Sequence, residues 1–240
     1  MKDIEKAAGF LNLFSDNVSA GMDVEPVTWI RENVVDQQSA RSSHIDFTLS
    51  PFLLDPIDKF LNDGTVKHIN LMAPTGSGKS TLFVGLLNYL IANDAGNTLV
   101  AFQNEQETSD FAETRLFPTF RDNKALKDLL PKKRHAARKT EILFPHMNLW
   151  MVSATKGQLQ SKSCRYLIGD EMWAWEKGMV REFLARHHDR FNRKILMVSQ
   201  GGDKGTDWVD EYGKGRIHHY HWQCPGCQGR NAYDWRDVIY

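Results

Sequence analysis

The chain has 240 residues, which leaves room for one α/β domain with short extensions and excludes a second large catalytic domain. Hydrophobic residues make up 41% of the sequence and charged residues 25%, proportions that exclude a disordered or collagen-like chain. Thirty Lys and Arg balance thirty Asp and Glu. No long-range field of one sign therefore surrounds the protein, and any contact with nucleic acid must be local.

The small number of cysteines and the absence of a long apolar run both indicate the cellular compartment of the protein. Three cysteines are too few for a disulfide framework in a chain of this length, and they indicate a reducing environment. The sequence has no run of about 18 apolar residues, and its first six residues carry acids where a signal peptide is apolar. We therefore expect a cytosolic protein.

Three parts are expected along the chain. Residues 1–45 form an N-terminal helical arm, either a packing arm or a docking segment for a partner. Residues 46–215 form the core, and residues 216–240 form a C-terminal extension. Apolar periodicity predicts these core elements in order: helix 50–61, strand 66–72, helix 80–92, strand 98–102, helix 105–117, and strands 142–144, 149–152, 166–169 and 195–199. This alternation predicts an α/β fold, a mainly parallel sheet with helices on both faces and ligands at the carboxyl ends of the strands.

A phosphate-binding loop is the most informative feature of the sequence. Residues 73–81 read Ala-Pro-Thr-Gly-Ser-Gly-Lys-Ser-Thr and lie between a predicted strand and a predicted helix. Glycines let backbone N–H groups converge on phosphate oxygens, and the helix N-terminus adds its dipole. We expect Lys79 to reach the β- and γ-phosphates and Ser80 to bind Mg²⁺. The expected nucleotide-binding residues of the loop are Thr75, Gly76, Ser77, Gly78, Lys79, Ser80 and Thr81.

An acidic pair, Asp170 and Glu171, ends a later apolar strand. We expect this strand beside the strand that precedes the phosphate loop. Asp170 would then bind the nucleotide through Mg²⁺, and Glu171 would be the general base that activates water. An Asp-Glu pair alone is common on solvated surfaces, but this pair follows both a phosphate loop and an apolar strand. Together they predict a P-loop NTPase fold of the additional-strand (ASCE), RecA-like type.

The turn after strand 195–199 is a candidate sensor of the nucleotide state. Ser199 and Gln200 are expected to bind the nucleotide by hydrogen-bonding its γ-phosphate. An ordinary turn containing glycine is the alternative.

Five segments share a pattern with one protein family. They are a pre-loop helix at 50–57, a Ser- and Ala-containing stretch at 152–155, a Leu-x-Ser turn at 159–163, an Arg-Tyr run into the acidic pair at 165–171, and a Cys-Pro-x-Cys at 224–227. Together, over about residues 47–235, they resemble the ATPase of phage terminase large subunits of the GpA type, found in lambda-like tailed phages.

The resemblance implies an ATP hydrolase that uses ATP and Mg²⁺ to drive double-stranded DNA through a portal into an empty procapsid. It implies the portal protein and the small terminase subunit as partners. It also implies a homo-oligomeric ring when assembled, with the isolated chain a monomer or weak oligomer. The implied location is the host cytoplasm, at the procapsid portal.

The chain departs from the family pattern at two points. Many relatives carry Arg or Gln inside the phosphate loop, where this chain has Thr-Gly-Ser-Gly. The catalytic arginine is therefore expected elsewhere, at Arg165, with Lys162 or a residue of a neighbouring subunit as alternatives. Family proteins also continue into a nuclease domain, and because this chain ends before one, we expect no DNA cutting.

Two other functions stay open on the sequence. The loop also resembles the first motif of superfamily-2 helicases and translocases, but residues 153–155, Ser-Ala-Thr, precede the acidic pair here rather than follow it. A nucleotide-gated binding module that barely hydrolyses ATP is the third reading. Turnover with and without DNA, and unwinding of a forked duplex, separate these functions.

Cys224 and Cys227 have the spacing of half a zinc site. Tetrahedral zinc needs four ligands, so completing it takes histidines within 218–221 or ligands beyond the last residue. A reduced pair in a turn is the alternative.

A basic run lies at residues 131–139, with five Lys and Arg. Such a run either grips DNA phosphates without reading sequence or forms an ordinary solvated face.

Overall fold

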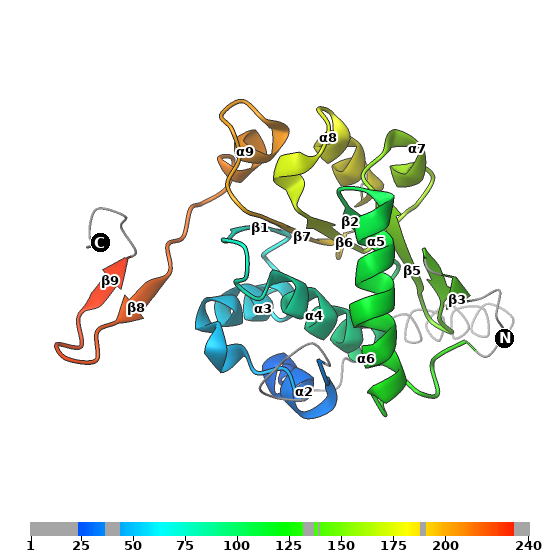
Figure 1. Ribbon diagram of the computed structural model, residues 1–240, viewed down its shortest axis with the longest axis horizontal. Coiled ribbons are helices and arrows are strands. Elements are labelled where there is room, and N and C mark those ends of the chain that lie inside the picture. Colours follow the sequence, from blue (N-terminus) through cyan, green and yellow to red (C-terminus); the bar gives the residue numbers. More distant parts are fainter. Residues whose placement is uncertain (1–23, 37–43, 132–136, 139, 188–190, 233–240) are drawn as a thin grey trace, which may run out of the picture.

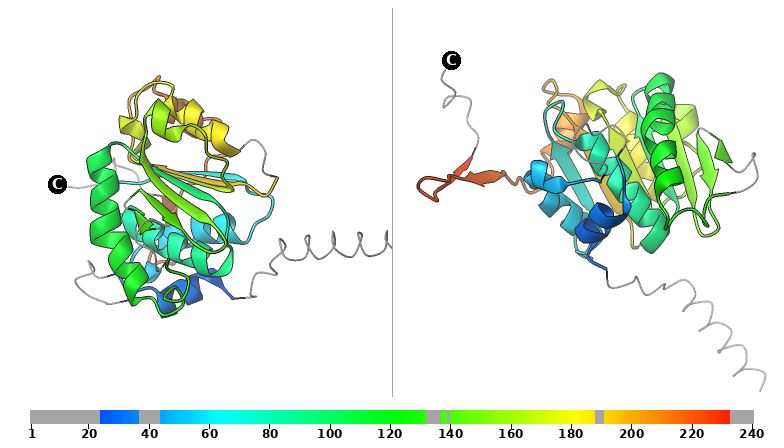
Figure 2. Two further views of the ribbon diagram at one scale, coloured as in Figure 1. Left: turned by 90° about the vertical axis from the view of Figure 1, so that its right-hand side faces the viewer. Right: turned by 60° about the horizontal axis from the view of Figure 1, so that its bottom comes forward.

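The computed structural model describes residues 24–36, 44–131, 137–138, 140–187 and 191–232. These residues form a central sheet with helices on both faces (Figure 1; Figure 2, left). The predicted α/β class and the mainly parallel sheet are therefore confirmed. The basic run is largely outside the described residues, as is the first half of the predicted arm.

The central sheet has seven strands in the order β1-β7-β6-β2-β5-β4-β3. Their bounds are β1 His68–Met72, β2 Thr98–Phe102, β3 Ala137–Arg138, β4 Glu141–Leu143, β5 Asn148–Ser153, β6 Tyr166–Asp170 and β7 Lys194–Ser199. The strands from β1 to β5 in this order run parallel, and β4 and β3 extend the sheet in antiparallel fashion. All but β3 were expected from the sequence, within two residues of these bounds.

One expectation about the sheet is wrong. The strand of the acidic pair, β6, does not lie beside the phosphate-loop strand β1, because β7 pairs with both of them. The register places Met72 of β1 opposite Ser199, and Asp170 of β6 opposite Val198. The inserted strand is the additional strand of this fold type, and it puts Ser199 between the loop and the acidic pair.

The helices of the described residues divide between the two faces of the sheet. Their bounds are α2 Pro26–Asn33, α3 Leu54–Leu61, α4 Lys79–Asn93, α5 Glu105–Phe111, α6 Phe117–Asp122, α7 Lys156–Leu159, α8 Met179–Leu184 and α9 Asp207–Tyr212. Alternate residues of β2 face opposite ways. Val100 and Phe102 join a core cluster with α2 to α6, and Leu99 and Ala101 join a second cluster with α7 to α9.

The described part of the N-terminal segment packs against the core, which is one of the two roles expected for it. Ile30 of α2, Val34 and Ile45 are at most 2% exposed and pack in the same cluster as α4. Gly85 of α4 allows this close approach, since a Cβ there would lie 3.0 Å from Ile30. Helix α4 is therefore covered on the side away from the sheet.

The C-terminal part leaves the domain as a hairpin. Strands β8 (His221–Gln223) and β9 (Arg230–Ala232) pair only with each other among the described residues. They project away from the layers (Figure 1; Figure 2, right). Near the root of the hairpin, the ring of Tyr220 packs edge-on against Phe52 at 6.0 Å.

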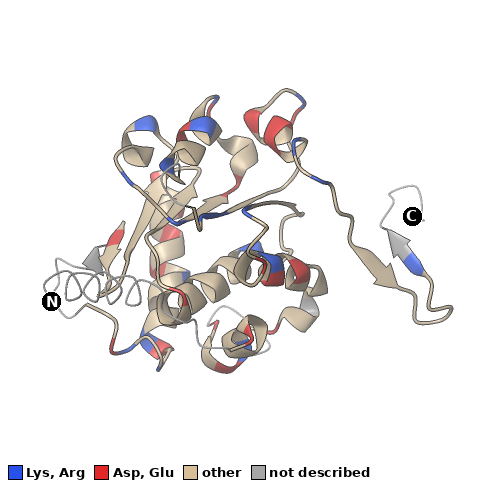
Figure 3. Ribbon diagram, turned by 180° about the vertical axis from the view of Figure 1, so that it is seen from behind, with Lys and Arg blue, Asp and Glu red and all other residues tan. Residues whose placement is uncertain are grey.

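Charge is distributed as the balanced composition predicts. Lys and Arg are interspersed with Asp and Glu over the helices and loops, and the central strands carry few of either (Figure 3). Within the described ranges, no helix combines the length and the apolar character needed to cross a membrane.

The burial of α2 predicts a measurable effect of truncating Ile30. Ile30→Ala should lower the free energy of unfolding by about 2–5 kcal/mol, because it leaves a cavity against α4. Denaturant titration followed by circular dichroism measures this change. Glu32→Ala, an exposed substitution on the same helix, is the control and should shift it by less than about 0.5 kcal/mol. Equal effects of the two substitutions would show that α2 contributes nothing to the core.

Candidate active site

The phosphate loop joins β1 to α4 in a conformation that requires glycine at two positions. Gly76 and Gly78 have φ of 77° and 89°, values that a residue with a Cβ rarely adopts. A Cβ at Gly78 would also lie 3.3 Å from the Ser50 hydroxyl oxygen and 3.4 Å from Leu53. The loop is therefore curled tightly against the helical turn that precedes α3.

Lys79 begins α4 and is 6% exposed. Its Nζ donates hydrogen bonds to the carbonyl oxygens of Ala73 (3.2 Å) and Pro74 (2.9 Å). The same nitrogen lies 3.6 Å from Oε1 of Glu171. The lysine thus points along the inside of its own loop toward the acidic pair.

The acidic pair lies at the carboxyl end of β6, as the sequence predicts. Asp170 is 8% exposed, and its Oδ1 accepts a hydrogen bond from the Glu171 backbone N–H at 3.0 Å. Burial, with the nearby Glu171 carboxylate, raises the pKa of Asp170 to about 7. Glu171 itself has φ 47° and ψ 48°, a left-handed conformation that is uncommon for a residue with a side chain.

Two tryptophans hold the acidic pair in place. Trp173 donates its indole N–H to Oε2 of Glu171 at 2.9 Å, and its backbone N–H to the Ser199 hydroxyl oxygen at 3.0 Å. Trp175 donates its indole N–H to the Asp170 carbonyl oxygen at 2.9 Å. Neither tryptophan was expected in the site from the sequence, although Trp173 lies two residues after the general-base candidate.

Ser199 and Gln200 lie next to the phosphate loop. The Ser199 carbonyl oxygen accepts the Ala73 backbone N–H at 2.9 Å, and Oε1 of Gln200 accepts the Thr75 hydroxyl at 3.2 Å. Through Trp173, Ser199 also contacts the turn that follows the acidic pair. The end of β7 therefore connects both halves of the site.

A cavity of about 500 Å³ lies over the phosphate loop. Lys79, Ser80, Thr81 and Glu171 line one part of it, and Asp36 with residues from the stretch 44–53 contributes another wall. Asp36 accepts a hydrogen bond from the Thr81 hydroxyl at 3.2 Å. The family pattern at residues 50–57 covers only one end of this wall, and local pattern did not predict that Asp36 and residues 44–47 face the loop.

A second cavity, of about 280 Å³, adjoins the first. Asp170 and Ser80 line it together with residues of α5. The two expected Mg²⁺ ligands therefore border one space, although they come from β6 and α4. Arg115, which the sequence analysis did not consider, lines both cavities.

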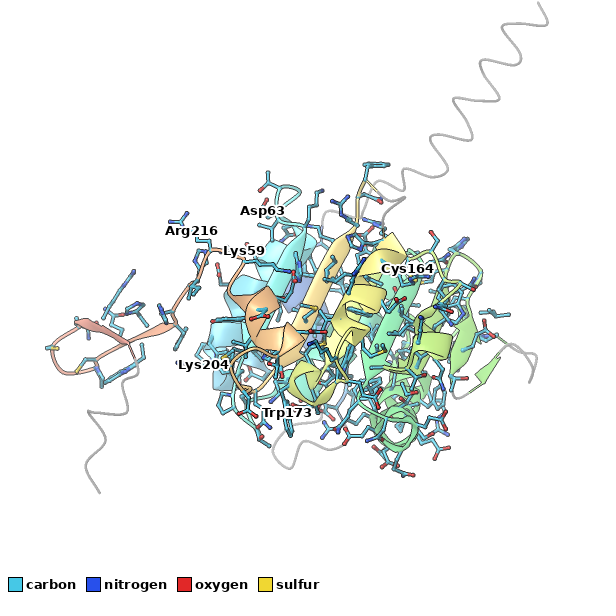
Figure 4. The ribbon with its side chains drawn as sticks, turned by 90° about the horizontal axis from the view of Figure 1, so that it is seen from above. Lys59, Asp63, Cys164, Trp173, Lys204 and Arg216 are labelled. Carbon is cyan, nitrogen blue, oxygen red and sulfur yellow. The ribbon has the colours of Figure 1, made fainter. Side chains whose placement is uncertain are left out.

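Arg165 lies outside this site, contrary to the expectation that it is catalytic. It precedes β6, whereas the acidic pair ends that strand, and its guanidinium forms two hydrogen bonds to the Asp94 carboxylate at 2.7 and 3.0 Å. Figure 4 shows the neighbouring Cys164 and the site residue Trp173 at opposite ends of the strand. Arg165 therefore stabilises the end of α4 in this chain. The alternative, Lys162, donates to the Gln158 carbonyl oxygen.

Cys224 and Cys227 occupy the turn of the β8–β9 hairpin. The Cys224 backbone N–H donates to the Gly229 carbonyl oxygen, and the Gln228 backbone N–H donates to the Cys224 carbonyl oxygen. The largest influence on the Cys224 thiol is the hydrogen bond from the Cys227 backbone N–H, which holds the pKa of the thiol below its usual value. The described residues contain no group of three or more His, Cys, Asp or Glu placed to hold a metal ion. Two thiols alone do not make a structural zinc site.

The residues present fit a magnesium-bound triphosphate. The loop supplies converging N–H groups, a buried lysine and, at Ser77, a buried hydroxyl oxygen with no hydrogen-bond partner among the described residues. Ser80 and Asp170 supply the oxygen donors that Mg²⁺ prefers. Glu171 stands across the loop from Lys79, where a carboxylate can accept a proton from water.

The burial of Asp170 predicts that replacing it stabilises the metal-free chain. Asp170→Asn should raise the free energy of unfolding at pH 8 by about 1–3 kcal/mol, because an amide is less costly to bury than a carboxylate. The pKa is raised from 3.8 in the unfolded chain to about 7 in the folded one, so the cost of this carboxyl to folding grows as the pH rises from 4 to 7 and is complete above pH 7. The gain should therefore shrink as the pH falls from 7 toward 4. Denaturant titrations in chelator at several pH values measure this.

The control for this titration series is Asp128→Asn, which neutralises an exposed carboxylate. It should change the unfolding free energy by less than about 0.5 kcal/mol at every pH. A gain for Asp170→Asn that is the same at pH 5 and pH 8 would contradict the assignment of a buried, costly charge.

Comparisons with known proteins agree with this geometry. Residues 39–240 match the family model described as phage terminase large subunit gpA, ATPase domain. No curated protein matches the chain. Among solved structures, the large terminase of bacteriophage HK97 is similar with a TM-score of 0.65 and 14% identity, over 79% of this chain and 40% of that one. The UvsW helicase of bacteriophage T4 is similar with a TM-score of 0.53 and 13% identity, over 87% and 74%.

At these identities the structural similarities show the fold alone, a P-loop, RecA-like domain. The chain spans about 40% of the HK97 protein's length. The family match, in contrast, covers most of this sequence, including the phosphate loop, the acidic pair and the cysteine pair. The chain therefore belongs to the gpA family of phage terminase large subunits, and residues 39–240 correspond to the ATPase domain of that family.

Proposed function

We propose that this chain hydrolyses ATP and uses the energy to move double-stranded DNA into a viral procapsid. The observation that carries the proposal is the 3.6 Å approach between Nζ of Lys79 and Oε1 of Glu171. These residues belong to α4 and to the end of β6, 92 positions apart in the sequence, which the fold brings to one cavity. A phosphate-binding lysine and a general base so close together are what nucleotide hydrolysis needs.

In this proposal each residue of the site has one task. Lys79, whose Nζ now donates to two loop carbonyls, exchanges them for oxygens of the β- and γ-phosphates. Ser80 and Asp170 hold Mg²⁺, which when bound neutralises phosphate charge. Oε1 of Glu171 accepts the proton of the attacking water, while Trp173 keeps the other carboxylate oxygen fixed.

The end of β7 is proposed to sense the γ-phosphate. Gln200 already contacts Thr75 of the loop, and Ser199 contacts both the loop backbone and Trp173. A change in the loop on phosphate release would alter these hydrogen bonds directly. Ser199 and Gln200 then connect the loop with the turn that carries the general base.

The partners and the location of the protein are part of the same proposal. They are double-stranded DNA, the portal protein, the small terminase subunit and further copies of this chain in a ring, in the host cytoplasm at the procapsid portal. Support comes from the family, whose description is that of a phage terminase large subunit. The helicase alternative has the fold and the phosphate-loop motif in common with this chain, and activity on a forked duplex would distinguish it.

We assign no zinc ion to the cysteine pair within this chain. The two thiols are half of a ligand set, and the described part of the chain places no third ligand beside them. A zinc ion in a longer protein would need further ligands from outside the described residues. The proposed DNA contact of the basic run concerns residues 131–139, most of which the structure does not describe.

Two substitutions test the proposed function. Glu171→Gln should keep ATP binding and lower kcat by about 10²–10⁴-fold, because the amide cannot accept the proton of water. Lys79→Ala should weaken ATP binding by about 10–100-fold, the loss of a charged hydrogen bond to phosphate. Phosphate release assays and titration with a fluorescent ATP analogue measure the two effects, with and without double-stranded DNA.

The wild-type chain and Lys156→Ala, an exposed lysine at the start of α7, are the controls. Lys156→Ala should bind and hydrolyse ATP like the wild type. Normal turnover by Glu171→Gln would show that the base is misassigned, and a wild-type chain that binds no adenine nucleotide would overturn the proposed function as a whole.

The hydrogen bond from Trp173 to Glu171 gives a separate prediction. Trp173→Phe removes the indole N–H but keeps a large ring, and it should lower kcat about tenfold, the value of one hydrogen bond to a charged group, with KM for ATP unchanged. Phosphate release measured at several ATP concentrations gives kcat and KM for this variant.

Trp150→Phe is the matched control for this substitution. Trp150 also donates its indole N–H to a glutamate, Glu141, at 2.7 Å, but on β5 and β4. Trp150→Phe should leave kcat unchanged. Equal kcat values for the two variants would refute a positioning role of Trp173.

A further inference from the structure

Arg115 is a cationic residue of the site that belongs to neither the phosphate loop nor the acidic pair. It lies between α5 and α6, in a π-helical segment that spans Ala112–Leu116. The inference drawn from it rests on the proposed function and assigns one residue of the same reaction. Because Arg165 pairs with Asp94 outside the site, a different arginine must neutralise the transferring phosphate.

The π-helical segment sets the direction of Arg115. Helices α5 and α6 and the segment between them form one nearly continuous helical rod beside α4 (Figure 1). The wider turn of a π-helix changes the angular position of the residues within it, and such turns are frequent at functional sites. The Arg115 carbonyl oxygen accepts the Thr119 hydroxyl at 2.7 Å, which fixes the backbone at this point.

Arg115 stands where the two cavities of the site meet. The larger cavity is lined by Arg115 with Lys79 and Glu171, and the smaller one by Arg115 with Asp170. Among the described residues, Ser80 and Arg115 line both cavities. Arg115 therefore borders both the space lined by Asp170 and the space lined by Lys79.

The guanidinium of Arg115 has no carboxylate within 4.0 Å among the described residues, although the residue is half-buried. Arg165, in contrast, is paired with Asp94 through two hydrogen bonds. A partly desolvated cation without an anion is unfavourable unless an anion binds there. Its planar fork of donors matches the oxygens of a phosphate group.

We propose that Arg115 is the catalytic arginine of this chain, acting within the same subunit on the γ-phosphate of ATP. Water adds to the γ-phosphorus, the bond from that phosphorus to the bridging oxygen breaks, and its electron pair leaves with ADP. The water proton goes to Glu171. Arg115 hydrogen-bonds the γ-phosphate oxygens, on which negative charge is spread in the transition state.

The test compares Arg115→Ala with the wild-type chain by two readouts. In Arg115→Ala, kcat for ATP should fall about 100-fold or more, and affinity for ADP with aluminium fluoride and Mg²⁺, a mimic of the transferring phosphate, should fall by a similar factor. The preference for ATP over ADP, measured as a ratio of Kd values, should fall about tenfold, whereas the Kd for ADP itself stays unchanged. Arg115→Lys keeps the charge without the fork and should be intermediate in kcat.

The matched control is Arg121→Ala, an exposed arginine of α6 that lines neither cavity. It should retain wild-type values in every assay, and thermal unfolding should show both alanine variants folded. If the wild type binds and hydrolyses ATP and Arg115→Ala behaves like Arg121→Ala, the proposed function stands and the role of Arg115 is overturned. If the wild type binds no nucleotide, the proposed function itself fails.

Discussion

The site depends on one buried charge, the ammonium group of Lys79. Taking an ammonium group out of water is costly unless it is hydrogen-bonded and paired. Here two carbonyl oxygens of its own loop and the carboxylate of Glu171 surround it. The carbonyls come from the turn after β1 and the carboxylate from the turn after β6, so this arrangement exists only when the sheet is complete. Nucleotide affinity and folding are therefore coupled at this lysine.

Much of the architecture could be predicted from local sequence. The strand at 98–102 was predicted with the bounds that the structure gives it, because it is a short apolar run between polar turns and is buried on both faces. The phosphate loop and the acidic pair were predicted from residue types alone, since converging amides need glycine and metal binding needs carboxylates. Such features depend on a few neighbouring residues, which a sequence displays directly.

The remaining features depend on contacts between distant residues, and local pattern did not predict them. Arg165 looked catalytic because it precedes the acidic pair in the chain, but its partner Asp94 is 71 positions away and at the other end of the strand. The pairing of β7 with both β1 and β6 is likewise a property of the whole sheet. The π-helical turn at Arg115 was predicted as ordinary helix, because helical periodicity does not register one wider turn.

The position of β7 between β1 and β6 also sets the distance between the ends of those two strands. Neighbouring strands in a sheet lie about 4.8 Å apart, so the ends of β1 and β6, two intervals away from each other, are separated by about 10 Å. Directly paired strands would halve this separation between the turn that begins the phosphate loop and the turn that carries the acidic pair. The middle strand is in this sense a spacer of fixed thickness, and the backbone hydrogen bonds that hold it keep the two turns of the site at a constant separation.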